Sequence, residues 1–184
     1  SLILRPDVSP ADAPKITLMS AVAVANAIRN ATHLGALIKW PNDILINNRK
    51  VCGILTEMSA EINTVKYIVL GIGINVNTAK ADLPKEATSL KAELGESVAR
   101  VELAQELLRE LERQYFIFKE KGFKKIIEEW KGLSHTLGEE VKIACHGRKV
   151  EGTATDLDTS GALVVRLDNG FTEHITAGDV IMVR

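Results

Sequence analysis

The sequence predicts an α+β protein in which strands and packed helices are followed by a small β-barrel. Three observations support this fold class. Residues 65–76 form a strand-like apolar run spaced by glycines, and residues 101–121 repeat leucines at helical spacing. After Ser134 the pattern changes to several short apolar runs separated by glycine-bearing turns, which is typical of a small barrel. The change places a boundary near residue 135, giving domains of residues 1–134 and 135–184.

The composition is that of an ordinary globular protein. Of 184 residues, 46% are hydrophobic and 26% charged, which is enough for a substantial core. The net charge of −1 gives no electrostatic footprint for nucleic acid. The longest apolar run, within residues 16–28, is too short for a membrane span, and the first residues lack the form of a signal peptide. Two distant cysteines, Cys52 and Cys145, favour reduced thiols and a cytoplasmic location.

The first helix is predicted by a proline and an apolar run. Pro14 suits the first turn of a helix, where its missing N–H costs nothing. We expect that helix over residues 16–31, buried because it is apolar nearly all round, with Gly35 as its stop. A short strand over residues 36–40 follows and ends at Pro41.

An asparagine pair predicts a tight hairpin. Asn47-Asn48 lies between expected strands at residues 44–46 and 50–58, and asparagine tolerates the positive φ that such a turn requires. A second turn at residues 61–64 leads to a third strand over residues 65–76.

The second half contains the expected helices and the barrel. Residues 78–100 are predicted as a loop with a short helix, residues 101–121 as an amphipathic helix closed by Gly122, and residues 123–130 as a helical piece ending at Gly132. The expected barrel strands are residues 141–144, 149–153, 162–167, 171–175 and 180–183, with turns at His146-Gly147, Ser160-Gly161 and residues 168–170.

Polar side chains gather around the predicted hairpin. Lys50 follows the turn and precedes Gly53, where a ligand could approach the backbone closely. By residue type alone, Lys50 is more often a solvent-exposed turn lysine, and Lys39, Asn42 and Asp43 could belong to a simple turn. Neighbouring strand ends nevertheless carry two lysines, one carboxylate and two amides. Such a mixture suits a site that binds an anionic ligand and orients a nucleophile.

Other motifs carry less chemistry. Gly71-Ile-Gly73-Ile-Asn75 is not a dinucleotide fingerprint, because its third glycine position is Val76 and no helix follows. Its glycines indicate close backbone approach, with Asn75 at the strand end. Cys145-His146 has no second pair at ligand spacing, so no metal site is predicted, and no catalytic triad is legible.

Three linked segments resemble the biotin protein ligases (biotin–[acetyl-CoA-carboxylase] ligases). KWPND, then RKVCGIL, then GIGIN match motifs that recur in that family in this order, and the barrel ending in GDVIMVR fits the family's SH3-like C-terminal domain. The resemblance covers essentially the whole chain. It implies a mixed sheet with packed helices of the class II synthetase and biotin ligase type, followed by the SH3-like barrel.

The resemblance also implies roles for individual residues. Lys50 would contact the biotin carboxylate and the adenylate and neutralise charge during adenylation. Asp43 would orient or deprotonate the acceptor lysine, and Lys39 and Asn42 would help to hold the nucleotide and its phosphates. The other residues assigned to biotin or adenylate are Trp40, Gly53, Ile54, Gly71, Gly73, Ile74, Asn75 and Arg184.

The implied reaction has two steps and several partners. Biotin and ATP give biotinyl-5′-AMP and pyrophosphate, and a lysine of a biotin carboxyl carrier protein domain then attacks the mixed anhydride. Mg²⁺ is expected to accompany the triphosphate. The resemblance also implies a homodimer formed by edge-to-edge extension of the sheet. The charge and the short apolar runs predict neither a nucleic-acid nor a membrane partner through this chain.

One departure from the family pattern concerns its Gly/Arg-rich loop, which covers biotin and the phosphates and precedes the KWPND segment. Residues 1–38 contain a single glycine, Gly35, and no such loop. We therefore expect a catalytic domain that begins within the family's fold and whose activity alone is impaired. Alternatives are a lipoate-type ligase, a non-catalytic biotin-responsive transcriptional regulator, and a barrel that serves only as a docking module.

Overall fold

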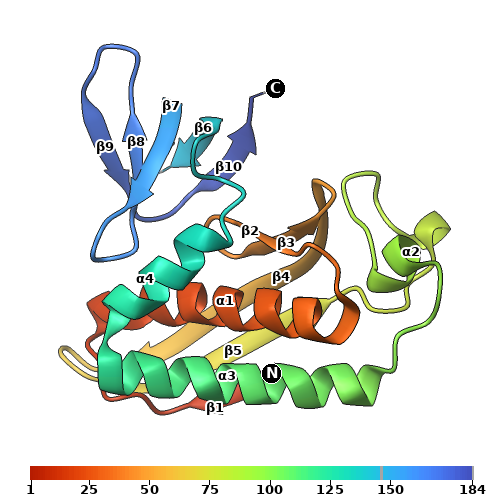
Figure 1. The fold of residues 1–184 in the computed structure, drawn as a ribbon. Helices are drawn as coiled ribbons and strands as arrows, with labels where there is room; N and C mark the ends of the chain where they lie inside the picture. Colours follow the sequence, from red (N-terminus) through yellow and green to blue (C-terminus); the bar gives the residue numbers. More distant parts are fainter. Residues whose placement is uncertain (146, 184) are drawn as a thin grey trace.

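Two antiparallel sheets occur in the described residues, and they follow one another along the chain (Figure 1). The computed structural model describes residues 1–145 and 147–183. The first sheet has the strand order β1-β5-β4-β3-β2. Its strands are β1 (Leu2–Leu4), β2 (Leu37–Lys39), β3 (Asp43–Ile46), β4 (Arg49–Ala60) and β5 (Val65–Ile74).

The pairings of the first sheet differ in one respect from the mixed sheet expected. Every strand pair described in it is antiparallel, and parallel contacts are limited to isolated bridges, Ile38 with Ser134 and Lys50 with Ala87. The reason is that tight turns connect β3 to β4 and β4 to β5, and strands joined by short turns pair antiparallel. The apolar residues 2–4 do not by themselves predict a strand, because three residues show too little alternation, yet they form β1.

Helix α1 (Ala13–Thr32) packs against one face of this sheet and follows a short 3₁₀ turn, η1 (Pro10–Asp12). Alanine and valine fill its buried sides, so that nearly the whole helix is covered. The helix begins with the predicted proline but does not end at Gly35. Its C-cap is His33, which adopts a left-handed conformation with φ 59° and whose N–H donates a hydrogen bond to the Arg29 carbonyl.

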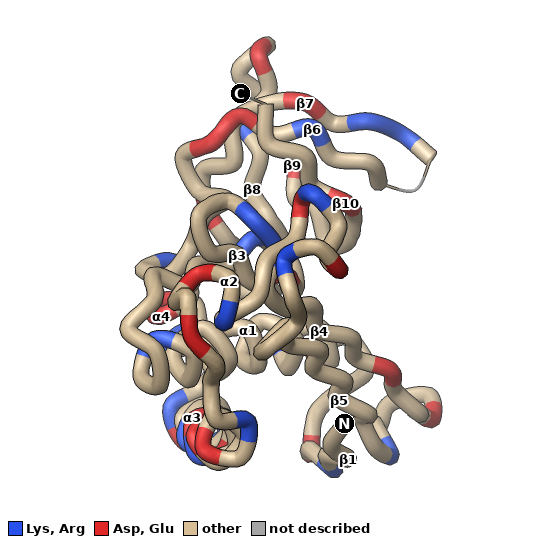
Figure 2. The backbone as a smooth tube through the Cα atoms, turned by 90° about the vertical axis from the view of Figure 1, so that its right-hand side faces the viewer, with Lys and Arg blue, Asp and Glu red and all other residues tan. Residues whose placement is uncertain are grey.

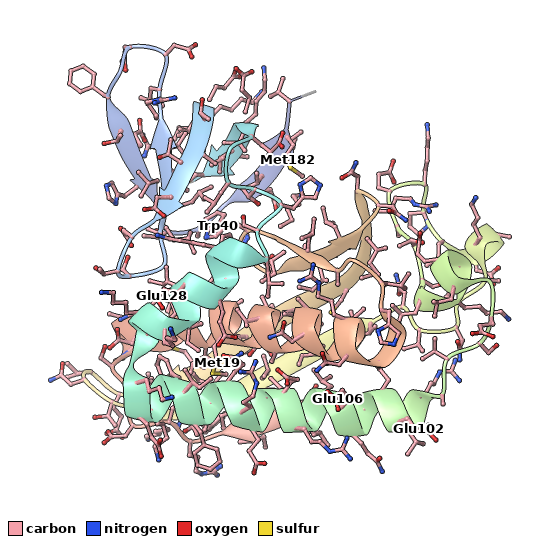
Figure 3. All side chains as sticks on the ribbon, in the orientation of Figure 1. Met19, Trp40, Glu102, Glu106, Glu128 and Met182 are labelled. Atoms are coloured by element: carbon pink, nitrogen blue, oxygen red, sulfur yellow. The ribbon has the colours of Figure 1, made fainter. Side chains whose placement is uncertain are left out.

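Two further helices cover α1 on the same side of the sheet. Helix α3 (Arg100–Lys121) lies along α1, and α4 (Phe123–Gly132) follows after Gly122 (Figure 1). Figure 2, turned by 90°, shows α1, α3 and α4 on one side of β4 and β5. Met19 lies between α1 and α3 (Figure 3) and is 1% exposed, so the main apolar core occupies this layer. The helices predicted over residues 101–121 and 123–130 are confirmed.

The asparagine hairpin forms as predicted. Asn47 and Asn48 have φ values of 50° and 62° and join β3 to β4. Directly after the turn the register shifts. Ile44 pairs with Cys52 and Leu45 with Lys50, so Val51 is one residue more than β3 can match. Val51 therefore forms a β-bulge, which changes the direction of the side chains that precede it.

The segment between β5 and α3 contains a 3₁₀ turn, η2 (Lys80–Asp82), and the short helix α2 (Leu90–Leu94). The Ser89 side chain caps α2 by accepting a 3.1 Å hydrogen bond from the Ala92 N–H, and Gly95 ends it at φ 84°. The predicted loop with a short helix is therefore confirmed.

The second sheet has the order β10-β6-β7-β8-β9 and antiparallel pairing. The described pairings leave β9 and β10 at its edges, so a small antiparallel sheet stands where a closed barrel was expected. The predicted turn at His146-Gly147 lies partly outside the described residues. The strands are β6 (Glu140–Cys145), β7 (Arg148–Leu157), β8 (Leu163–Arg166), β9 (Thr172–Ile175) and β10 (Asp179–Met182).

The second sheet contacts the first part of the chain around Trp40, which is 2% exposed (Figure 3). The Trp40 backbone N–H donates to Thr136 Oγ1 at 2.9 Å, and its indole Nε1 donates to the Gly161 carbonyl at 3.2 Å. Gly161 has φ 90°, which residues with a side chain rarely adopt, and a Cβ there would lie 2.5 Å from Leu18 Cδ1, so glycine suits this close approach. Within the described residues, no helix is long and apolar enough to cross a membrane. Both cysteines are free and buried.

Candidate functional site

The two faces of β4 and β5 carry different residues. Cys52, Ile54 and Thr56 point toward α1, as the 2.7 Å contact between the Thr56 and Thr17 hydroxyl groups indicates. The opposite side of β4, β5 and β1, which we call the open face, carries Gly53, Leu55, Gly71, Gly73 and Ile3 in the alternate positions. Leu55 is 62% exposed and Ile3 is 64% exposed, so the described residues leave this face largely uncovered.

Lys50 and Asp43 meet on the open face. Asp43 pairs with Gly53 across the sheet, so it shares that face, and the bulge at Val51 places Lys50 there too. Lys50 Nζ lies 2.6 Å from Asp43 Oδ1, and their side chains are 48% and 19% exposed. The structure thus brings together the cation and the carboxylate that the sequence singled out.

Glycines form the floor beside this ion pair. A Cβ on Gly53 would lie 3.2 Å from both Cε and Nζ of Lys50, so the lysine side chain lies directly over that glycine. Gly73 is directly opposite Gly53, and Gly71 is opposite Leu55. A ligand on this floor could contact backbone atoms and the lysine together.

Asn75 lies at the end of this strand pair, and hydrogen bonds through Val51 and Thr88 connect it to the backbone around Lys50. Its N–H donates to the Val51 carbonyl at 2.8 Å, and its side-chain Nδ2 donates to the Thr88 carbonyl at 3.1 Å. Thr88 in turn donates its N–H to the Lys50 carbonyl at 2.8 Å. Lys39 pairs with Asp43 in the sheet register, which places it on the same side as the ion pair.

Other predicted residues lie elsewhere. Ile54 and Ile74 alternate with glycines of the floor and therefore face the helices, and Ile54 is 2% exposed. The Asn42 side-chain Nδ2 donates to the Ile54 carbonyl at 2.8 Å, and the Trp40 indole donates to the Gly161 carbonyl in the loop between β7 and β8. Arg184 lies outside the described residues.

A cavity of about 350 Å³ adjoins this region without containing the ion pair. Its walls come from the start of α1, from Trp40 and Asn42, from residues 54–58 of β4 and from Gly161 and residues 176–178 of the second sheet. Ile54 and Thr56 line the cavity from the side that α1 covers, whereas the lysine amine lies on the open face. We take the open face as the candidate site because the converging charges and the glycine floor are found there, and ligand recognition needs such polar groups.

The loop that contributes Gly161 to the cavity wall is held by a carboxylate. Asp158 accepts hydrogen bonds from the N–H groups of Ser160 and Ala162 at 2.8 and 3.0 Å and contacts His174 at 2.7 Å. Burial acts to raise the pKa of Asp158, but the hydrogen bonds of Ser160, His174 and the backbone outweigh it and lower that pKa to about 2. The loop therefore presents the Gly161 carbonyl to Trp40 in a fixed position.

Sequence reasoning did not single out the segment around Thr88 and Glu93. Glu93 accepts hydrogen bonds from Asn47 and Arg49, which flank the hairpin turn, although it lies more than forty residues away in the chain. The one signal in the sequence was Ser89 as a helix cap, which predicts where α2 begins but not which way Glu93 points.

Comparison with known proteins shows that the fold is that of the class of biotin and lipoate ligases. Residues 1–75 match the Biotin/lipoate A/B protein ligase family, and residues 136–183 match the Biotin protein ligase C terminal domain. The biotin--[acetyl-CoA-carboxylase] ligase of Paracoccus denitrificans is 31% identical over 173 residues, covering 90% of this chain and 72% of that protein. The chain belongs to the biotin protein ligase family.

Two other relatives extend the comparison. The bifunctional ligase/repressor BirA of Bacillus subtilis is 38% identical over 181 residues, covering 96% of this chain and 56% of that protein. The biotin protein ligase of Aquifex aeolicus in complex with biotin and ATP matches with a TM-score of 0.80 and 29% identity, covering 92% of this chain and 71% of that chain. Against BirA, therefore, the chain spans little more than half of the relative's length.

Proposed function

We propose that this chain provides the carboxylate-activating face of a biotin protein ligase, which makes biotinyl-5′-AMP from biotin and ATP and transfers biotin to a lysine of a carrier protein. The observation that carries the proposal is the Lys50–Asp43 pair above the glycine floor. Family membership and the relative that binds biotin and ATP support the choice of substrates.

The first step brings two anions together. A carboxylate oxygen of biotin bonds to the α-phosphorus of ATP, the bond from that phosphorus to the bridging oxygen breaks, and pyrophosphate leaves. Lys50 would offset the negative charge where the carboxylate meets the phosphate. The Lys50 side chain is 48% exposed, and an ion pair of this exposure is worth only about 0–1 kcal/mol. Lys50 can therefore exchange Asp43 for a substrate anion at small cost.

The second step needs a neutral amine. Asp43 would accept a proton from the ammonium group of the carrier lysine, and that amine would attack the carbonyl carbon of the mixed anhydride. AMP then leaves with the electron pair of the broken C–O bond. Asp43 is suited to this role because it adjoins Lys50, so it lies beside the place where the anhydride forms.

The remaining assignments follow the geometry. Lys39 shares the side of the ion pair and would contact the nucleotide phosphates, while Asn75 would contact the adenylate. Asn42 and Trp40 would shape the neighbouring cavity wall. We assign Gly53, Gly71 and Gly73 to the floor beneath biotin, and Ile54 and Ile74 to the packing that supports it.

Mg²⁺ would enter with ATP. The described residues contain no group of three or more His, Cys, Asp or Glu side chains that could hold a metal ion. Mg²⁺ commonly keeps several waters and binds through substrate phosphates, so such a group is not required. Bound in this way, it would screen the triphosphate oxygens.

Domain organisation and assembly are part of the same proposal. Residues 1–134 would form the ligase-type part and residues 135–184 the C-terminal domain. The carrier would be a biotin carboxyl carrier protein domain. A homodimer formed through a sheet edge remains a prediction, and β1 and β2 are the edges of the first sheet. Sedimentation of the chain with and without biotin tests it.

Binding measurements test the proposed site most directly. The 184 residues contain no Gly/Arg-rich segment before KWPND, and we expect adenylate formation by them alone to be slow. Calorimetry with biotinyl-5′-AMP should give binding that Lys50→Met weakens by about tenfold or more, because a charge-assisted contact is lost.

A matched control distinguishes the loss of a specific contact at Lys50 from the loss of any exposed positive charge. Lys125 is also an exposed lysine in an ion pair, 2.8 Å from Glu128, and Lys125→Met should leave biotinyl-5′-AMP binding unchanged. Equal effects of both variants would contradict the assignment of Lys50. Binding of lipoyl-AMP in preference to biotinyl-5′-AMP would instead favour a lipoate-type ligase.

A further inference from the structure

We propose that Glu93 is a positioning residue for Lys50, an inference that rests on the proposed function. Glu93 lies in α2, and its side chain is 5% exposed although its backbone is partly accessible. It accepts hydrogen bonds from Asn47 Nδ2 at 2.7 Å, from Arg49 Nη2 at 2.6 Å and from the Thr88 hydroxyl group. Three donors from two separate segments thus converge on one nearly buried carboxylate.

Both segments contact the backbone of Lys50. Asn47 belongs to the hairpin turn and Arg49 is the residue before Lys50. On the other side, the Lys50 N–H donates to the Glu86 carbonyl at 2.9 Å, and the Thr88 N–H donates to the Lys50 carbonyl at 2.8 Å. Glu93 therefore fastens together the two stretches of chain between which Lys50 is held.

The chemistry of the contact requires a carboxylate. An ionised carboxylate only accepts hydrogen bonds and offers about four lone-pair directions, which suits three donors. An amide of the same shape would turn an NH₂ group toward at least one donor and leave it unpaired in a buried position. A glutamine at this position should therefore loosen the hairpin although it fills the same space.

The arrangement also separates two adjacent cations. Arg49 lies 2.6 Å from Glu93, and Lys50 lies 2.6 Å from Asp43, so each cation has its own carboxylate. Neighbouring strand residues point to opposite sides, which keeps the guanidinium group away from the open face. Of Arg49 and Lys50, therefore, Lys50 is the one that a substrate anion could reach.

Hydrogen exchange tests the positioning role without any ligand. In Glu93→Gln, the amides of Lys50 and Thr88 should exchange about tenfold faster or more, because the segments that hold them open locally. The amide of Ile143 in β6 should keep its protection and so reports global stability. If Glu93→Gln fails to fold, Thr88→Val removes one of the three donors and should give a smaller change at the same amides.

A double-mutant cycle then asks whether Glu93 acts through Lys50. Glu93→Gln should weaken biotinyl-5′-AMP binding by about tenfold in the wild-type background but by less than about threefold in Lys50→Met. Glu110→Gln is the matched control, because Glu110 is also a mostly buried carboxylate, 2.9 Å from Arg113 on α3. It should leave both the exchange and the binding unchanged.

The outcomes distinguish this inference from the proposed function. Unchanged exchange at Lys50 and Thr88 in Glu93→Gln, or the same loss of binding in both backgrounds, would overturn the positioning role. A wild-type chain that does not bind biotinyl-5′-AMP, or a Lys50→Met variant that binds it normally, would overturn the proposed function instead. In that case the exchange data still decide whether Glu93 orders the Lys50 segment.

Discussion

The two faces of β4 are made by alternating residues of one strand, yet they have opposite properties. Toward α1, Cys52 and Ile54 are 1% and 2% exposed and belong to the core. On the open face, Gly53 lies under an ion pair and Leu55 is 62% exposed. The two faces of the strand therefore have different roles. Substitutions on the covered face change the packing of the core, and those on the open face change a surface on which a ligand could bind.

The β-bulge decides on which face Lys50 lies. In a regularly alternating strand, Lys50 would share the side of Cys52 and Ile54 and would point an ammonium group into the core. The extra residue, Val51, allows both Val51 and Cys52 to be buried and returns Lys50 to the open face beside Asp43. One inserted residue thus reconciles an apolar core with a charged site.

The largest expected effect tests the two faces with neighbouring residues. Ile54→Ala should lower the free energy of unfolding by about 2–5 kcal/mol, because it leaves a cavity under α1. Leu55→Ala should change it by less than about 0.5 kcal/mol, because that side chain is already in solvent. Urea unfolding of both variants checks this. Similar losses would mean that the open face is covered in solution.

These faces show how far sequence reasoning reached. Asn47-Asn48 was predictable because few residues tolerate positive φ, and the meeting of Lys50 with Asp43 was anticipated from their places at neighbouring strand ends. Strand alternation alone separates Gly53 from Ile54, so the two cannot line one floor with their side chains. The bulge at Val51 leaves no such mark in the sequence, because it depends on the register with β3.

Contacts between distant parts of the chain could not be predicted from the sequence either. Glu93 is one of several glutamates in a polar stretch, and nothing local distinguishes it from the exposed ones. Its burial depends on how α2 folds back on the hairpin, more than forty residues earlier in the chain. Likewise, the contact of Trp40 with Gly161 joins two distant segments. Such residues are found only when the tertiary structure is known.

The next largest effect concerns ligand binding on the open face. A Cβ at Gly53 would already lie 3.2 Å from Cε and Nζ of Lys50. The two further methyl groups of Gly53→Val would crowd the lysine side chain, and we expect them to displace its amine from Asp43. We expect biotinyl-5′-AMP binding to weaken by about tenfold with little change in melting temperature. Gly35→Val is the control, since a Cβ there meets nothing within 4 Å. Unchanged binding in Gly53→Val would remove that glycine from the site.

An effect of similar size comes from the covered face at alkaline pH. Burial, with the nearby Asp43 carboxylate, raises the pKa of Cys52 from 9.0 to about 12. The unfolded chain then loses the thiol proton first, so the contribution to stability is complete below pH 9 and is lost as the pH rises toward 12. Between pH 8 and 10 the loss should be about 1.4 kcal/mol.

Comparison with Cys52→Ala isolates this contribution, because other groups titrate in the same range. Guanidinium unfolding at pH 8 and pH 10 should show a smaller decrease with pH for the variant than for the wild-type chain. Equal decreases would mean that the thiol reaches solvent, and would therefore weaken the assignment of Cys52 to the covered face.

The smallest effect probes a polar contact within the covered face. The hydroxyl groups of Thr17 in α1 and Thr56 in β4 lie 2.7 Å apart. Thr17→Val should cost about 1 kcal/mol, because it leaves the Thr56 hydroxyl without this partner, whereas the double variant Thr17→Val with Thr56→Val should be nearly neutral. Thermal unfolding of the wild-type chain, of Thr17→Val, of Thr56→Val and of the double variant measures the difference. If the double variant lost as much as the sum of the two single variants, the hydroxyl groups would act independently, and the helix would not be fastened to the strand at this point.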